Sequence, residues 1–229
     1  IALLAPLYIG VAIALISTIL LAVVLKEPTR TVTSLRQKKR LKLSDKRTFP
    51  YILIGFMTFL AFSMASQTIG FYIQDRFFLD GRATAQAIGT GMMTAAIMSF
   101  FAQAFLAGRL KLTPIRLMTF GLPILMTSYG LLLFADSIAT LVIFLGVLGL
   151  GLGMVSPGFT AGASLAVGPN EQGAVSGLVS SCPAAGFVLG PIFGTSLYQI
   201  DHTLPYICSL VLMLPLTLYV WWFGWRRSR

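Results

Sequence analysis

Residues 186–195 read Gly-Phe-Val-Leu-Gly-Pro-Ile-Phe-Gly-Thr and lie within an apolar stretch that is long enough to cross a membrane. Gly186, Gly190 and Gly194 recur every four residues, so they share one face of a helix and leave it flat for close packing against a neighbour. Pro191 removes a backbone hydrogen bond and favours a kink. These residues predict a membrane helix that packs closely and bends, as a moving part of a protein would.

The composition of the whole chain indicates a membrane protein. Of its 229 residues, 56% are hydrophobic and 10% are charged. The mean hydropathy is +0.85, and no water-soluble domain hides that much apolar surface. Disordered chains, nucleic-acid-binding modules and disulfide scaffolds are more polar or richer in cysteine, so these classes are excluded despite a net charge of +10. Cys182 and Cys208 fall in apolar runs and are interpreted as buried thiols.

Apolar stretches of about 20 residues, each free of Asp, Glu, Lys and Arg, alternate with turn-forming or charged residues. The chain starts at Ile1 with no basic region ahead of its first apolar run, as a secretory signal would need, so we expect this start to lie inside a longer protein. We predict an all-α integral membrane protein with seven transmembrane helices, at about residues 1–25, 50–73, 85–108, 117–135, 138–165, 173–199 and 203–225.

Basic residues lie almost entirely on one side of this topology. Segment 26–49, the loop 109–116 and the tail after residue 225 together hold fifteen Lys and Arg, whereas the opposite side holds Arg76 and Arg82. Because positive residues mark the cytoplasmic side, the central segment and the carboxy terminus are expected in the cytoplasm. The basic run within the central segment is interpreted as an anchor at anionic headgroups, with a nucleic-acid or localisation signal as the alternative.

Candidate catalytic or metal-binding residues are absent from the predicted spans, where such polar groups are costly and are kept for function. The only histidine, His202, lies at the outer end of a span and is interpreted as a solvated turn pair with Asp201, with pH sensing as the alternative. Gly149, Gly151 and Gly153 lie inside an apolar span with no preceding strand, so they do not form a dinucleotide loop. We expect no enzyme activity, no metal and no cofactor.

A seven-helix receptor or retinal protein is the alternative class with this number of spans. Retinal binding needs a lysine in the last span, and residues 203–225 contain none. No cysteine lies near an outer loop to fix the extracellular face. The sequence therefore favours another class of membrane protein.

The stretch at 186–195 resembles the Gly-x-x-x-Gly-Pro-x-x-Gly-Gly signature of proton-coupled exporters in the major facilitator superfamily, with Thr195 in place of the last glycine. In that family the signature lies in the fifth of twelve helices, and a weaker copy lies in the eleventh because the two halves are structural repeats. Only the eleventh position accounts for all seven predicted spans. The resemblance implies helices six to twelve, with 1–25 as the sixth helix, 26–49 as the basic cytoplasmic loop between the halves, and 50–229 as the carboxy-terminal six-helix bundle.

A second region resembles the drug:proton antiporters of this superfamily. Glycines recur across residues 146–153, Pro157 follows, and residues 167–177 read Val-Gly-Pro-Asn-Glu-Gln-Gly-Ala-Val-Ser-Gly, as in the tenth-to-eleventh helix junction of that group. The loop 108–112 departs from the family, because Leu112 occupies the position of the aspartate in the family's loop signature. A cytoplasmic gating ion pair centred on that carboxylate is therefore not expected in this half.

The resemblance implies a proton-coupled exporter of small apolar or amphipathic molecules, in which two six-helix halves rock about a site at the membrane midplane. The expected partners are a small-molecule substrate, protons, an amino-terminal transporter half and the lipid bilayer, with no nucleic acid; the expected location is a bacterial inner membrane. The seven spans contain no ionisable group for proton coupling, so either the coupling carboxylates lie in the first five helices or the protein is not proton-coupled. A facilitator or importer of the same fold is the alternative.

Two predicted spans, 50–73 and 85–108, carry polar stripes at helical spacing. A polar stripe facing lipid is unfavourable, so these stripes are expected to face the bundle interior or a water-filled path. Gln67 is the preferred binding residue because it lies nearer the middle of its span than Gln74 or Gln86 does. The alternative is that Gln67 and Gln86 hydrogen-bond neighbouring helices together. The cavity candidates are Ser63, Gln67, Gly70, Gln74, Gln86, Thr90 and Met93, and the packing and bending motif is Gly186, Gly190, Pro191 and Gly194.

Thiol labelling tests the predicted topology. Cysteines placed at Ser34 and Ser228 are expected to react with an impermeant thiol reagent only after the membrane is opened, because both positions belong to the basic side. A cysteine at Ser137 is expected to react in intact cells. Labelling of position 34 from outside contradicts the orientation.

Overall fold

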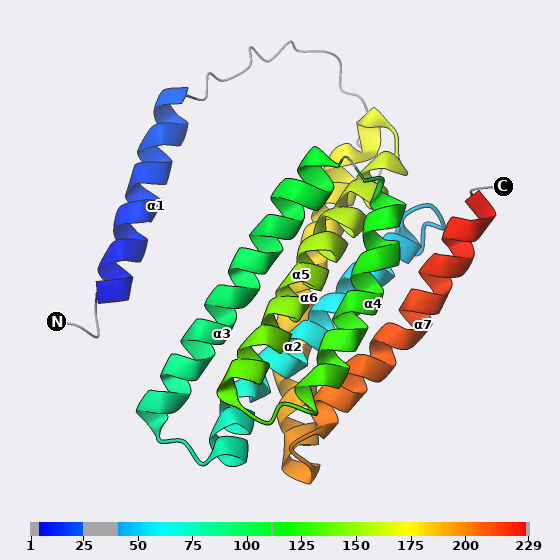
Figure 1. The fold of residues 1–229 in the computed structure, drawn as a ribbon. Coiled ribbons are helices and arrows are strands. Elements are labelled where there is room, and N and C mark those ends of the chain that lie inside the picture. The colour runs from blue at the N-terminus through cyan, green and yellow to red at the C-terminus, as the bar shows by residue number, and fades with distance from the viewer. Residues whose placement is uncertain (1–4, 25–40, 111, 228–229) are drawn as a thin grey trace. The chain divides into compact units, whose positions relative to one another are not determined.

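The computed structural model describes residues 5–24, 41–110 and 112–227 (Figure 1). The described chain is helical, with no strand in these ranges. One helix, α3, continues directly into a π-helical segment, η1, and a single 3-10 turn, η2, precedes α6. The elements are α1 (Ala5–Val24), α2 (Phe49–Phe77), α3 (Gly81–Phe101), η1 (Ala102–Arg109), α4 (Pro114–Leu132), α5 (Ile138–Leu165), η2 (Pro169–Glu171), α6 (Gln172–Ile200) and α7 (Leu204–Arg227).

Six of the seven predicted spans correspond to helices that are long and apolar enough to cross a membrane. The first predicted span, 1–25, corresponds to α1. Its apolar part among the described residues, Gly10–Val24, is shorter than each of the other six spans. The chain divides into two compact units, Ile1–Gln37 and Lys38–Arg229, and α1 forms the helix of the first. The predicted basic run at 36–40 lies outside the described residues.

The second unit is a six-helix bundle built around α2 and α5. Helix α2 packs against α6, α7 and α5, while α5 also packs against α3 and α4, and α4 packs against α7. Half or more of the apolar window is buried in α2 (61%) and α5 (50%), against 17% for the α3 window and 22% for the α6 window. Helices α3 and α6 therefore each keep one broad face free of contact with the rest of the unit.

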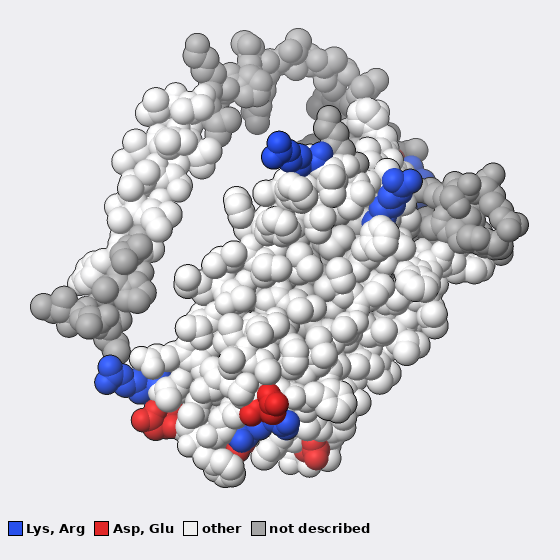
Figure 2. Space-filling view, in the orientation of Figure 1, with Lys and Arg blue, Asp and Glu red and all other residues white. Residues whose placement is uncertain are grey.

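Charged residues lie at the two ends of the bundle, and the long side shown in Figure 2 is uncharged between them. One end carries Asp75, Arg76, Asp80, Arg82, Asp136 and Asp201. This distribution is the one that a bilayer requires, because ionised groups are costly in hydrocarbon.

The end of α2 corrects the predicted boundary at residue 73. The helix continues to Phe77 and ends where Phe78 adopts a left-handed conformation with φ 51°. Asp75 and Arg76 therefore lie in the last helical turn rather than in a loop. Arg76 Nε donates to the Ala135 carbonyl at 2.6 Å, and Asp75 accepts a hydrogen bond from Tyr198 of α6. Because both charged side chains have partners outside α2, the helix continues through them.

Glycine allows α6 to lie directly on α2. A Cβ atom added to Gly186 would lie 2.7 Å from the Phe59 carbonyl carbon, and one added to Gly194 would lie 2.9 Å from the Met64 carbonyl oxygen. A Cβ at Gly190 would overlap Ser63. Between α5 and α3, Gly149 faces the Ala95 backbone in the same way. These contacts bring helix backbones together, as small residues do in membrane helix pairs.

The Gly190 contact predicts a position-specific loss of stability. Gly190→Ala is expected to lower the melting temperature of the detergent-solubilised protein by several degrees, since overpacking costs about 1–3 kcal/mol. Gly177→Ala is the matched control on the same helix, because a Cβ there meets no atom within 4 Å, and its melting temperature should not fall. Adding Ser63→Gly to Gly190→Ala should restore stability. Equal melting temperatures for the two alanine variants contradict the contact.

Candidate functional site

The predicted polar stripe of α2 divides into a buried and an exposed part. Ser63 is fully buried against Gly190, and its hydroxyl has no hydrogen-bond partner among the described residues. Gly70 is half-buried, with its Cα facing the Ile88 side chain of α3. Gln67 and Gln74 are exposed. The stripe thus spans two environments, because Ser63 lies in the α2–α6 contact while Gln67 and Gln74 lie on the surface of the unit.

The predicted stripe of α3 lies on the exposed face of that helix. Gln86, Thr90 and Met93 are all exposed, and the face continues through Ile97 and Phe101. The Thr90 hydroxyl donates to the Gln86 and Ala87 carbonyls at 3.0 Å, so its own helix satisfies it. The six-helix unit leaves these side chains open rather than enclosing them in a pocket.

An aromatic cluster that the sequence analysis did not identify joins α2, α5 and α6. The Phe59 ring lies 6.2 Å from the Phe159 ring in an edge-on arrangement and 6.2 Å from the Phe187 ring. Phe62 packs edge-on against Phe187 at 6.1 Å. Phe187 is 45% exposed, so the cluster presents aromatic surface beside the glycine contact of α6. Such surface suits apolar or amphipathic ligands.

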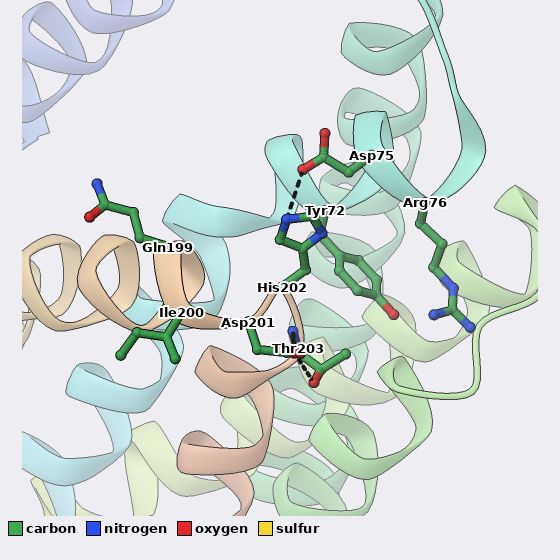
Figure 3. A pocket seen from close by; sticks show the side chains of 8 residues that line it. All are labelled: Tyr72, Asp75, Arg76, Gln199, Ile200, Asp201, His202 and Thr203. Atoms are coloured by element: carbon green, nitrogen blue, oxygen red, sulfur yellow. Dashed lines mark hydrogen bonds and ion pairs between the residues drawn. The ribbon is translucent and has the colours of Figure 1, made fainter.

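A polar pocket of about 380 Å³ lies between the end of α2 and the α6–α7 turn (Figure 3). Its lining includes Asp75 on α2 and His202 in the turn. Asp75 Oδ2 accepts a hydrogen bond from the Tyr198 hydroxyl at 2.5 Å and lies 3.8 Å from His202 Nε2. The His202 ring also stacks on Tyr198, with centroids 4.7 Å apart. Three side chains from separate elements thus hold the ends of α2 and α6 and the turn to α7 together.

This arrangement corrects the predicted pairing of His202 with Asp201. The Asp201 carboxylate instead accepts hydrogen bonds from the Thr203 amide at 2.7 Å and the Thr203 hydroxyl at 2.5 Å. These bonds stabilise the ionised form and lower the pKa of Asp201. His202 pairs across the pocket with Asp75, which lies 127 positions earlier in the chain and which a local motif cannot indicate.

At the opposite end, Arg47 joins the segment before α2 to the α5–α6 junction. Its guanidinium donates to both Glu171 carboxylate oxygens at 3.1 Å and to Asp45 at 2.8 Å. The neighbouring carboxylates raise the pKa of Arg47, and Arg47 lowers the pKa of Asp45. The sequence analysis did not predict this bridge, and its signal was the presence of Asp45 and Glu171 among the many basic residues of this end.

Among the described residues, no three His, Cys, Asp or Glu side chains come close enough to hold a metal ion. The polar groups of the site are amides, hydroxyls and the His202–Asp75 pair, and such groups suit non-covalent binding.

Comparison with known proteins places these features in a family context. The model of the Major Facilitator Superfamily matches residues 3–182 and, in a second alignment, 82–229. Multidrug resistance protein 1 of Bacillus subtilis (strain 168) is 28% identical over 225 residues, which cover 95% of this chain and 56% of that protein. Major facilitator superfamily domain-containing protein 10 of Mus musculus is 26% identical over 172 residues, which cover 72% of this chain and 36% of that protein. The chain thus spans about half the length of the first relative and about a third of the second.

Proposed function

Because the chain belongs to the major facilitator superfamily, a family of membrane transporters and not of enzymes, we propose that it forms the carboxy-terminal half of a twelve-helix transporter. In this assignment α1 is the sixth helix, residues 26–49 form the loop between the halves, and α2 to α7 are helices seven to twelve. Matches to two relatives that are longer than this chain support the assignment.

The observation that carries the proposal is a difference between the exposed faces of the bundle. Glutamines 67, 74 and 86 are exposed on α2 and α3, and exposed serines and threonines extend along α6. By contrast, the exposed residues in the middle of α7 are apolar, including Val211, Leu214 and Leu218. Lipid suits the apolar face of α7, whereas the glutamine amides on α2 and α3 favour water, since unpaired amide groups are costly in hydrocarbon. We propose that the face of α2, α3 and α6 lines a path shared with the amino-terminal half.

We further propose that the whole protein exports small apolar or amphipathic molecules by alternating access. The name of the Bacillus relative, a multidrug resistance protein, and the aromatic surface at Phe187 both support this substrate class. The described spans hold Asp75 and Arg76 in the last turn of α2, at the membrane edge, so a coupling carboxylate at depth would come from the other half. A bacterial inner membrane with the basic end in the cytoplasm is the proposed location.

Within this path we propose Gln67 as a binding residue, with Gly70, Gln74, Gln86, Thr90 and Met93 as neighbours along the exposed faces. Ser63 is better explained as part of the α2–α6 contact, because it is fully buried there. The exposed amide of Gln67 has no hydrogen-bond partner among the described residues, so it is available to a ligand. Phe187 adds an aromatic contact.

Substitution of Gln67 in the full-length protein tests the proposed site. At matched membrane abundance, Gln67→Ala and Gln67→Leu are expected to change substrate range or raise the apparent KM several-fold, because one buried hydrogen bond contributes about 1 kcal/mol. Val211→Ala, on the apolar face of α7, should leave transport unchanged. Unchanged transport of every substrate by both Gln67 variants excludes this residue from binding.

A further inference from the structure

A groove of about 410 Å³ runs between α2 and α7 at the basic end of the bundle. Phe49, Leu53 and Met57 line one wall, and Leu212, Leu216 and Tyr219 line the other. Every lining side chain is apolar except for the phenol of Tyr219. Ile54, which is 2% exposed, and Leu216, which is 7% exposed, form the floor, whereas Phe49 at the mouth is 44% exposed. The groove is therefore a lined recess on the side of the bundle, open to its surroundings.

The length of the groove matches one leaflet of a bilayer. From Phe49 to Met57 the α2 wall extends about 12 Å, at 1.5 Å per residue of helix. The α7 wall from Leu212 to Tyr219 extends about 10 Å on the same basis. One leaflet of the hydrocarbon core is about 15 Å thick. A single acyl chain that lies along the groove is thus in contact with the protein over most of the thickness of that leaflet.

A lysine precedes the first residues of the groove lining by one turn. The Phe49 amide donates to the Asp45 carbonyl at 2.8 Å, so residues 45–49 form a single turn that leads into α2. Lys46 therefore precedes Phe49 and Pro50 by three and four residues and shares their face. Lys46 is exposed and forms no ion pair with a described residue, whereas Arg47 next to it is committed to Asp45 and Glu171. Lys46 is therefore an exposed cation, without an ion pair among the described residues, one turn ahead of the groove.

Aromatic residues place this mouth at the membrane–water interface. Tyr219 at the groove and the exposed Trp221 and Trp222 beyond it lie in the last turns of α7. Trp221 Nε1 donates to the Thr119 carbonyl at 3.0 Å, which fixes the indole at this level of the bundle. Tyrosine and tryptophan side chains collect at the level of lipid headgroups. The lysine and the apolar groove thus lie on opposite sides of the headgroup boundary.

We propose that the α2–α7 groove binds one anionic phospholipid, with an acyl chain along the groove and the headgroup phosphate at Lys46. The ammonium group pairs with the phosphate as a point charge. An anionic lipid is favoured over a zwitterionic one because it brings no competing positive charge to the lysine. The site lies on the α7 side of the bundle, away from the exposed polar face of α3, and does not depend on the transported substrate.

Lipid titration of the full-length protein tests the site. Delipidated protein is titrated with phosphatidylglycerol or phosphatidylcholine, and native mass spectrometry gives the affinity of the tightest-bound lipid. Lys46→Gln is expected to weaken phosphatidylglycerol binding about fivefold, the loss for one basic residue at a lipid surface, and to leave phosphatidylcholine unchanged. Lys46→Arg should retain binding. Met57→Trp, which fills the groove, should weaken both lipids.

Two controls separate the site from general effects. Arg109→Gln removes a charge at the end of η1, outside the groove, and Leu218→Trp adds bulk to an exposed position of α7 outside the groove lining. Both should bind phosphatidylglycerol as the unmodified protein does. Lys46 is exposed, so Lys46→Gln tests the proposal even if Met57→Trp fails to fold. Phosphatidylglycerol affinity that is unchanged by Lys46→Gln, or lowered equally by Arg109→Gln, overturns the proposal.

Discussion

Close contact between helix backbones at glycine is the interaction on which the rest of the bundle depends. Gly186, Gly190 and Gly194 place α6 directly on α2, and Gly149 places α5 on α3. In a bilayer the sides of helices gain little from burying apolar surface, so association rests on close packing of this kind. The two contacts fix α2 and α5 at the centre and leave α3 and α6 attached by one face each. The exposed faces that we assign to a transport path follow from this arrangement.

The ends of the bundle are held by a different kind of contact. At one end Asp75, Tyr198 and His202 connect α2 to the α6–α7 turn, and at the other Arg47 connects the start of α2 to Glu171. Both sets of partners lie where water solvates charged groups, so each contributes modestly to stability. They nevertheless restrain the two ends of α2 and α6, whose backbones are already in contact at mid-height. A six-helix unit restrained in this way is suited to move as one body.

Local sequence patterns were sufficient to predict the family, six of the seven spans and the glycine face of α6. A period of four identifies residues that share a face, and the uncharged length identifies a span. The direction of a face depends on the neighbouring helix, which is why Ser63 lies buried against Gly190 while Gln67 on the same stripe is exposed. The extension of α2 to Phe77 depends on Ala135 and Tyr198, far along the chain. Pairing of His202 with Asp75 and the exposure of Phe187 likewise depend on how separate helices are rotated, which periodicity does not specify.

The central claim is that the exposed polar face of α2 and α3 borders water, whereas the exposed face of α7 borders lipid. Cysteines placed one at a time at Gln67, Thr90, Val211 and Leu218 compare the two faces directly. The measurement is their rate of reaction with a small, charged thiol reagent in membranes containing the full-length protein, with Cys182 and Cys208 replaced by alanine. The account predicts rapid reaction at positions 67 and 90 and little reaction at 211 and 218. Reaction at 67 and 90 as slow as at 218 would contradict it.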